Sequence, residues 1–339
     1  MGNRQPVRVA KHQGYWQSTL GFPVDREDVL DTVKLAATAL LSWLWPVEEF
    51  LSVARKKYHV RGEWARCIDL IVARLLSEHI SMQHAYEIDL VWRARHLEER
   101  MQILALHRPG CSWQPRIQMH GLEHLKSALE RKSGALIWVS DFVYSSLITK
   151  MAFHQAGYEV SHLTRPQHGF SDSPYGVRVL NPLWTKIEDR YIVERISIDK
   201  EGTDTALELV RRRLSANRIV SITVGNWARR TLDLAFFKGV IRLATGPAHL
   251  SWVCHAPLLP VFTVRSDSGE YHVSIDAAIE QTTSKGDYAQ TMQSYVKILE
   301  EYVLRYPDQW NGWVRNVLRE PSDDHVYVHR TDLPFRCSC

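Results

Sequence analysis

Apolar positions follow two different periods along the chain. Between residues 25 and 106 they recur at helical spacing, first from Asp28 and then over residues 63–76 and 80–106. From residue 117 onward, short apolar runs alternate with helical segments. That alternation is typical of a mainly parallel sheet flanked by helices. The pattern therefore predicts an α/β fold with an N-terminal helical subdomain.

The same pattern divides the chain into four parts. We expect an N-terminal tail at residues 1–24, the helical subdomain at 25–112, the α/β domain at 113–320 and a polar C-terminal tail at 321–339. In the helical part, the charged run 93–100 is predicted to be a solvated helix face with i,i+4 pairs. The strands of the α/β domain are expected at residues 117–121, 135–139, 158–163, 219–224, 258–264 and 271–275, and its helices at 122–132, 144–156, 204–215, 246–254 and 290–305.

Composition narrows the class of protein. Of the 339 residues, 45% are hydrophobic and 24% are charged, which suits a globular protein with a sizeable core. The formal net charge of +4 fits an anionic partner, such as a phospholipid surface or RNA, without requiring one, and we expect no DNA partner. The five cysteines are irregularly spaced, which favours a reduced, cytoplasmic chain.

The sequence predicts no membrane span. The longest uncharged apolar stretch, residues 35–47, is too short to cross a bilayer, and the polar start of the chain does not resemble a signal peptide. Trp43, Trp45 and Phe50 would allow this segment to lie in a membrane interface, although a core helix is favoured. We therefore expect a cytoplasmic protein and leave open a peripheral contact with the inner face of the membrane.

Residues 134–146 carry the most informative chemistry. A buried strand is followed by a short polar turn that contains Asp141, and a helix begins just after it. Open α/β sheets place their chemistry where the carboxyl ends of strands meet helix N-termini. The polar loop at 164–176, which carries Arg165 and His168, is long enough to bind a ligand.

Several short motifs follow one another between residues 115 and 318. They are a lead-in helix and strand at 121–137, the Arg165-Pro166 pair, a Phe-Phe-Lys-Gly element at 236–239, a small-residue turn at 245–248, a strand pair at 256–271 and the Pro-Asp-Gln-Trp segment at 307–310. As an ordered set, these motifs resemble the lipid A biosynthesis acyltransferases, the lauroyl/myristoyl transferase branch of the lysophospholipid acyltransferase superfamily. The resemblance implies a bacterial biosynthetic transferase with the α/β fold of that family.

The resemblance also implies a catalytic pair that this sequence lacks. In the family, a histidine at the turn acts as general base on an acceptor hydroxyl, and an acidic residue five positions later orients it. Those two positions hold Asp141 and Ser146 here, and an Asp-Gln pair after a later strand is replaced by Gly225-Asn226. Of the polar set that the family implies, Arg165 remains.

The first interpretation is therefore an acyltransferase with altered chemistry, in specialised metabolism. A small amine acceptor is nucleophilic when neutral, so Asp141 could serve as a weak base or an orienting group. Arg165 and Asn226 would stabilise an oxyanion or a donor phosphate. The expected acyl donor is carried on coenzyme A, on acyl-carrier protein or on a charged tRNA, the last because of the basic tracts at 211–213 and 229–230.

Other interpretations stay open. Ser145 or Ser146 could act as a covalent nucleophile with His168 as its base. A catalytically inactive binding or partner protein could have kept the fold, with Asp141 capping the helix that follows. A lipid acyltransferase acting at the membrane surface is a further alternative. The candidate catalytic residues are Asp141, Arg165, Ser145, Ser146 and His168, and the candidate substrate-binding residues are Tyr144, Asn226 and Trp227.

No metal and no cofactor are predicted. His249, Cys254 and His255 lie close together in the sequence, but their spacing is not that of a metal site. Neither of the common Gly-rich phosphate loops occurs in the sequence.

Overall fold

A computed structural model gives the fold. It describes residues 16–17, 23–24, 26–44, 65–111, 113–198, 203–226, 228, 230–281, 287–315 and 318–319. In this part of the chain no helix is both long enough and apolar enough to cross a membrane.

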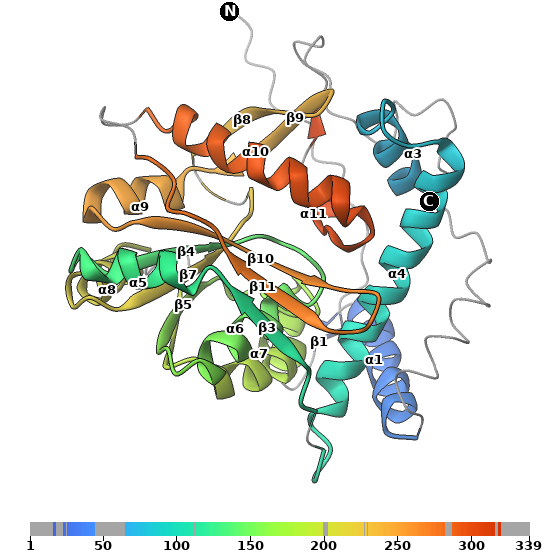
Figure 1. The fold of residues 1–339 in the computed structure, drawn as a ribbon. Helices are drawn as coiled ribbons and strands as arrows, with labels where there is room; N and C mark the ends of the chain where they lie inside the picture. The colour runs from blue at the N-terminus through green and yellow to red at the C-terminus, as the bar shows by residue number, and fades with distance from the viewer. Residues whose placement is uncertain are drawn as a thin grey trace, which may run out of the picture.

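A seven-stranded sheet forms the centre of the molecule, in the order β3-β11-β10-β4-β7-β5-β6 (Figure 1). Five of its strands run in one direction, and the β3–β11 pair runs in the opposite direction because β10 and β11 form an antiparallel hairpin. The predicted mainly parallel sheet is therefore confirmed. The strands are β3 (Ile117–His120), β4 (Ala135–Val139), β5 (Val160–Thr164), β6 (Glu194–Ser197), β7 (Ile219–Thr223), β10 (Leu258–Arg265) and β11 (Tyr271–Ile275).

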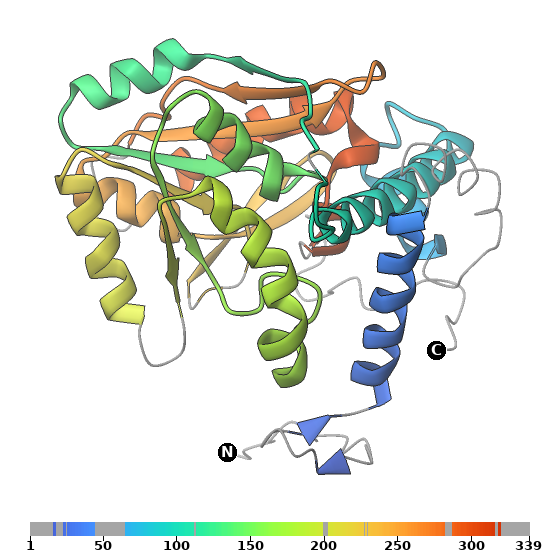
Figure 2. The same cartoon turned by 90° about the horizontal axis from the view of Figure 1, so that it is seen from below.

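Helices cover both faces of this sheet (Figure 2). Every residue of β4 is buried, and side chains alternate along a strand, so Leu136 and Trp138 join one core while Ile137 and Val139 join the other. The two cores explain why β4 reads as a continuous apolar run. The first core lies under α8 (Thr203–Ser215), α9 (Gly246–Cys254) and α10 (Ala289–Arg305), and the second under α5 (Leu122–Glu130), α6 (Ser145–Gln155) and α7 (Asn181–Glu188).

Among the described residues, three N-terminal helices lie at one end of the sheet: α1 (Arg26–Leu44), α3 (Ala65–Leu75) and α4 (Met82–Ala105) (Figure 1). Ser81 caps α4 by accepting the His84 N–H at 3.2 Å. α4 packs against α1 and α3, and it also contacts α7 and the 3-10 turn η3 (Pro307–Gln309). The helical region predicted from residue 25 is confirmed where it is described, and residues 45–64 lie outside the described part.

Several helices and strands of the structure were not predicted from the sequence pattern. A π-helical turn, η1 (Gly176–Leu180), and the 3-10 turn η2 (Asp189–Tyr191) flank α7. A small antiparallel sheet contains β8 (Thr231–Phe236), β9 (Gly239–Ala244) and β12 (Leu318–Arg319), and the short helix α11 (Gly312–Arg315) lies before β12 in the chain. Two-residue strands β1 (Trp16–Gln17) and β2 (Pro23–Val24) pair inside the predicted N-terminal tail.

Candidate active site

Three of the predicted site residues follow neighbouring strands of the sheet. Asp141 comes two residues after β4, Asn226 three residues after β7, and Arg165 directly after β5. β7 lies between β4 and β5, and the three strands are parallel, so their carboxyl ends share one edge. The structure therefore brings these three residues to the same edge of the sheet. Arg165 is exposed there, whereas Asp141 is buried.

The Asp141 turn is held by a segment near the end of the described chain. Asn311 donates from Nδ2 to Asp141 Oδ1 at 2.9 Å, and its backbone N–H donates to the Asp141 carbonyl, also at 2.9 Å. The Val143 N–H donates to the Gln309 carbonyl at 2.7 Å. These bonds fix both the backbone and the carboxylate of the turn, so Asp141 has a defined position.

α4 reaches the same turn from the other side. Glu99 accepts the Tyr144 N–H at 3.0 Å and the Ser146 hydroxyl at 3.5 Å, and His96 Nε2 lies 2.6 Å from Asn311 Oδ1. The prediction that 93–100 is a solvated helix face is therefore wrong, because Arg95, Glu98 and Glu99 of this run are buried. α6 has no side-chain cap of its own, and Glu99 rather than Asp141 accepts the N–H at its start.

Tyr144 lies inside a packed polar cluster. It adopts a left-handed backbone conformation with φ +70°, and its hydroxyl donates to Glu98, which also pairs with Arg265. Its ring makes an edge contact with Tyr271, the centroids being 5.4 Å apart. Burial and the negative charge of Glu98 raise the pKa of Tyr144 well above its usual value. The phenol therefore stays protonated, and the structure encloses it in protein contacts.

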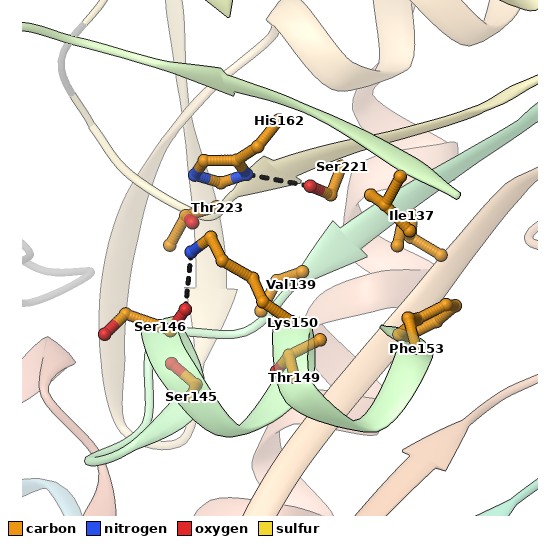
Figure 3. A pocket seen from close by; sticks show the side chains of 11 residues that line it. Ile137, Val139, Ser145, Ser146, Thr149, Lys150, Phe153, His162, Ser221 and Thr223 are labelled. Atoms are coloured by element: carbon orange, nitrogen blue, oxygen red, sulfur yellow. Dashed lines mark hydrogen bonds between the residues drawn. The ribbon is translucent and has the colours of Figure 1, made fainter. Parts of the chain in front are cut away.

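Ser145 and Ser146 line a small cavity between α6 and the sheet (Figure 3). Its volume of about 10 Å³ is enough for about one water molecule. Opposite the serines, His162 Nδ1 lies 2.7 Å from the Ser221 hydroxyl, while Lys150 donates to the Ser146 carbonyl. Burial, aided by the charge of Lys150, holds the pKa of His162 well below its usual value, so this imidazole is neutral.

His168 lies in a buried ionic cluster next to that cavity. Its Nε2 donates to Glu188, at 2.9 Å from Oε1, and the same carboxylate accepts from Lys150 at 3.1 Å and from Arg195 at 2.8 Å. Burial alone would raise the pKa of Glu188, but the positive neighbours hold it well below its usual value. Burial lowers the pKa of Lys150, and Glu188 opposes that change.

The structure does not bring His168 together with the predicted serines. Among the described residues, the side chain of His168 hydrogen-bonds to Glu188, and no hydrogen bond links it to Ser145 or Ser146. The cluster could not be predicted from the sequence, because Lys150, Glu188 and Arg195 come from three separate elements and meet only in the fold.

The remaining predicted features are placed as follows. Trp227 lies outside the described residues. His249 Nδ1 lies 2.8 Å from the Tyr288 hydroxyl, so this histidine has a protein partner. Within the described ranges, no three side chains of His, Cys, Asp or Glu lie close enough together to hold a metal ion.

Comparison with known proteins adds the family. A family model described as bacterial lipid A biosynthesis acyltransferase matches residues 92–319, which is more than half of the chain. The matched region begins within α4 and so includes both His96 and Asn311. No match was found among curated proteins. The family supports acyl transfer, with a donor and an acceptor, as the general activity. The chain belongs to the bacterial lipid A biosynthesis acyltransferase family.

Proposed function

We propose that this protein transfers an acyl or aminoacyl group from a carrier to a small amine-type acceptor at the Asp141 turn. The observation that carries the proposal is the nature of the group at that turn. A carboxylate, fixed by Asn311 at 2.9 Å, stands at the position where the family resemblance implies a histidine base. A carboxylate is a poor base for a hydroxyl acceptor, but it can accept a hydrogen bond from the N–H of a neutral amine.

The chemistry of an amine acceptor fits a weak base. The neutral nitrogen attacks the carbonyl carbon of the donor, so the C–N bond forms before any proton leaves. The nitrogen of the resulting intermediate is far more acidic than the free amine, and Asp141 can accept its proton. The C–S or C–O bond to the carrier then breaks, and the leaving group departs with a proton returned from Asp141.

The other candidate residues have supporting roles in this proposal. Arg165, exposed at the end of β5, would bind the phosphate of a carrier, and Asn226 would donate to the oxyanion. The carrier would be coenzyme A, acyl-carrier protein or a charged tRNA, and the setting would be specialised metabolism in the cytoplasm. If the protein consumes no donor, the alternative function is that of a catalytically inactive binding protein.

A second candidate function is a lipid acyltransferase acting at the membrane surface. One observation favours it: α1 exposes Val33, Leu40 and Leu44, at 60%, 58% and 81% of their full area. These residues are seven, four and eleven positions apart, so they lie along one side of the helix. An exposed apolar stripe of this kind can lie in a membrane interface.

A donor and acceptor screen tests the proposal. The purified protein is incubated with acyl-CoA, acyl-carrier protein thioesters or charged tRNA pools, with hydroxylamine as the amine probe and glycerophospholipid vesicles as the lipid acceptor. Formation of the hydroxamate from one donor class faster than in the reaction without protein supports the amine reaction, while acylation of the vesicle lipid supports the second candidate. A covalent acyl adduct in the intact mass would support the serine route instead.

Two further results refine the screen. Arg165→Ala should raise the KM for the donor at least tenfold without changing the melting temperature, whereas Arg131→Ala, an exposed arginine at the end of α5, should change neither. If charged tRNA is the donor, its binding falls steeply with salt. No donor consumption in any arm would support the binding protein.

A further inference from the structure

The side-chain amide of Asn311 lies between the Asp141 carboxylate, which accepts a hydrogen bond, and the His96 ring, which donates one. Its Nδ2 faces Asp141 Oδ1 at 2.9 Å, and its Oδ1 faces His96 Nε2 at 2.6 Å. The NH₂ end of an amide only donates and the carbonyl end only accepts. Because a carboxylate only accepts, the bond to Asp141 exists in one of the two orientations of the amide. Rotation by 180° would turn the Asn311 carbonyl oxygen toward the carboxylate.

The backbone does not choose between these orientations. The Asn311 N–H donates to the Asp141 carbonyl, which fixes the position of the residue, and its side chain is buried. The amide can still turn about its terminal torsion, where the preference is weak and two-fold. The choice therefore depends on the two side chains that the amide faces, Asp141 on one side and His96 on the other.

We propose that His96 is a positioning residue that sets the orientation of Asn311. By donating from Nε2 to Asn311 Oδ1, it keeps the NH₂ end on Asp141 and holds that carboxylate ready for the amine acceptor. The catalytic consequence rests on the proposed function, since it assigns Asp141 its task. The orientation of the Asn311 amide does not rest on the proposed function.

The surroundings of His96 keep it in place for this role. The ring packs edge-on against Trp92 with centroids 4.2 Å apart, and Nδ1 lies 4.0 Å from Glu99 Oε2. The Asn311 Oδ1 atom only accepts, so this contact requires a proton on Nε2 of His96.

Substitutions separate a positioning role from a packing role. Glutamine at position 96 can still donate from its side-chain amide to Asn311, whereas alanine cannot. His96→Gln should therefore keep most of the function that His96→Ala loses. His84→Ala, an exposed histidine on the same helix, is the matched control. Asn311→Asp places an acceptor against Asp141 and should behave like His96→Ala or worse.

The experiment has one readout that needs no substrate. Asparagine is labelled selectively with ¹⁵N, the side-chain NH₂ signals of Asn311 are assigned by their loss in Asn311→Ser, and their hydrogen exchange is measured. We expect slow exchange in the wild type, His96→Gln and His84→Ala, and exchange at least tenfold faster in His96→Ala. Equal protection in His96→Ala and the wild type would overturn the proposal.

The second readout is turnover with acyl-CoA and hydroxylamine. His96→Ala should lower kcat at least tenfold with little change in KM for hydroxylamine, and His96→Gln should recover most of kcat. Recovery by glutamine supports positioning, and equal loss in both variants overturns it. If the wild type consumes none of the three donor classes with hydroxylamine, the proposed function fails, and the exchange rates alone decide whether His96 orients Asn311.

Discussion

Glu99 of α4 accepts the backbone N–H of Tyr144 at 3.0 Å, and this bond satisfies a buried donor at the start of α6. The two residues are 45 positions apart in the chain. A carboxylate at this point also interacts favourably with the positive end of the helix. The N-terminal helices are thus joined to the candidate active site by a specific polar contact, in addition to apolar packing.

Removing this contact should destabilise the fold. In Glu99→Ala the Tyr144 N–H has lost its acceptor, which should lower the free energy of unfolding by about 1–3 kcal/mol. Glu99→Gln keeps an acceptor oxygen and should lose less. Urea denaturation measures both variants, with Glu87→Ala, an exposed glutamate on the same helix, as the control. Equal stability of Glu99→Ala and Glu87→Ala would contradict the assigned role.

Glu188 should be the most sensitive residue of the ionic cluster. It is completely buried and accepts hydrogen bonds from Lys150, His168 and Arg195. Glu188→Ala therefore leaves buried positive charges without their partner. Loss of one member of a buried ion pair costs about 3–5 kcal/mol. Denaturant unfolding should show this loss, while Glu208→Ala, in an exposed pair with Arg212, should change stability little. A loss below 1 kcal/mol at Glu188 would show that the cluster is not coupled.

The same carboxylate predicts a response to acid. Its folded-state pKa lies well below the usual 4.5, so its stabilising contribution is complete above that pH. The contribution is lost as the pH falls from 4.5 through the folded-state value. Stability measured against pH should therefore fall more steeply below pH 4.5 in the wild type than in Glu188→Gln. Parallel curves would contradict the lowered pKa.

Asp89 predicts a dependence of the opposite sign. Burial, partly offset by Arg93, raises its pKa from 3.8 to about 6. Folding therefore favours the protonated carboxyl, and stability is lost as the pH rises from about 4 through 6. Relative to Asp89→Asn, the wild type should lose on the order of 3 kcal/mol across this range. A difference that does not change with pH would contradict this account.

Much of the fold was predictable because its central strands are simple. β4 and β7 are apolar runs between turn signals, and both were placed correctly by periodicity. β6 was missed because it carries Glu194 and Arg195, whose charges are paired with groups from other elements. A charged residue is predicted to be exposed unless its partner is known, and the fold determines which group becomes its partner.

The same limit applies to the site. Asp141 could be found because the end of a buried strand is a local feature. Glu99 and His96 belong to the charged run 93–100, which the sequence pattern predicts to be a solvated helix face. Their partners become apparent only when α4 packs on the Asp141 turn. His168 is predicted as a base from its position in the loop after Arg165. In the structure its Nε2 donates to Glu188.

We propose that Asp141 acts in the reaction and is not needed to stabilise the fold. The measurement is turnover of acyl-CoA with hydroxylamine by the wild type and Asp141→Asn, together with the melting temperature of each. Asparagine keeps an oxygen for Asn311 but cannot take the proton, so we expect kcat to fall about a hundredfold or more at an unchanged melting temperature. Asp267→Asn, in the exposed turn after β10, is the control. Full turnover in Asp141→Asn, or a lower melting temperature with turnover retained, would contradict the account.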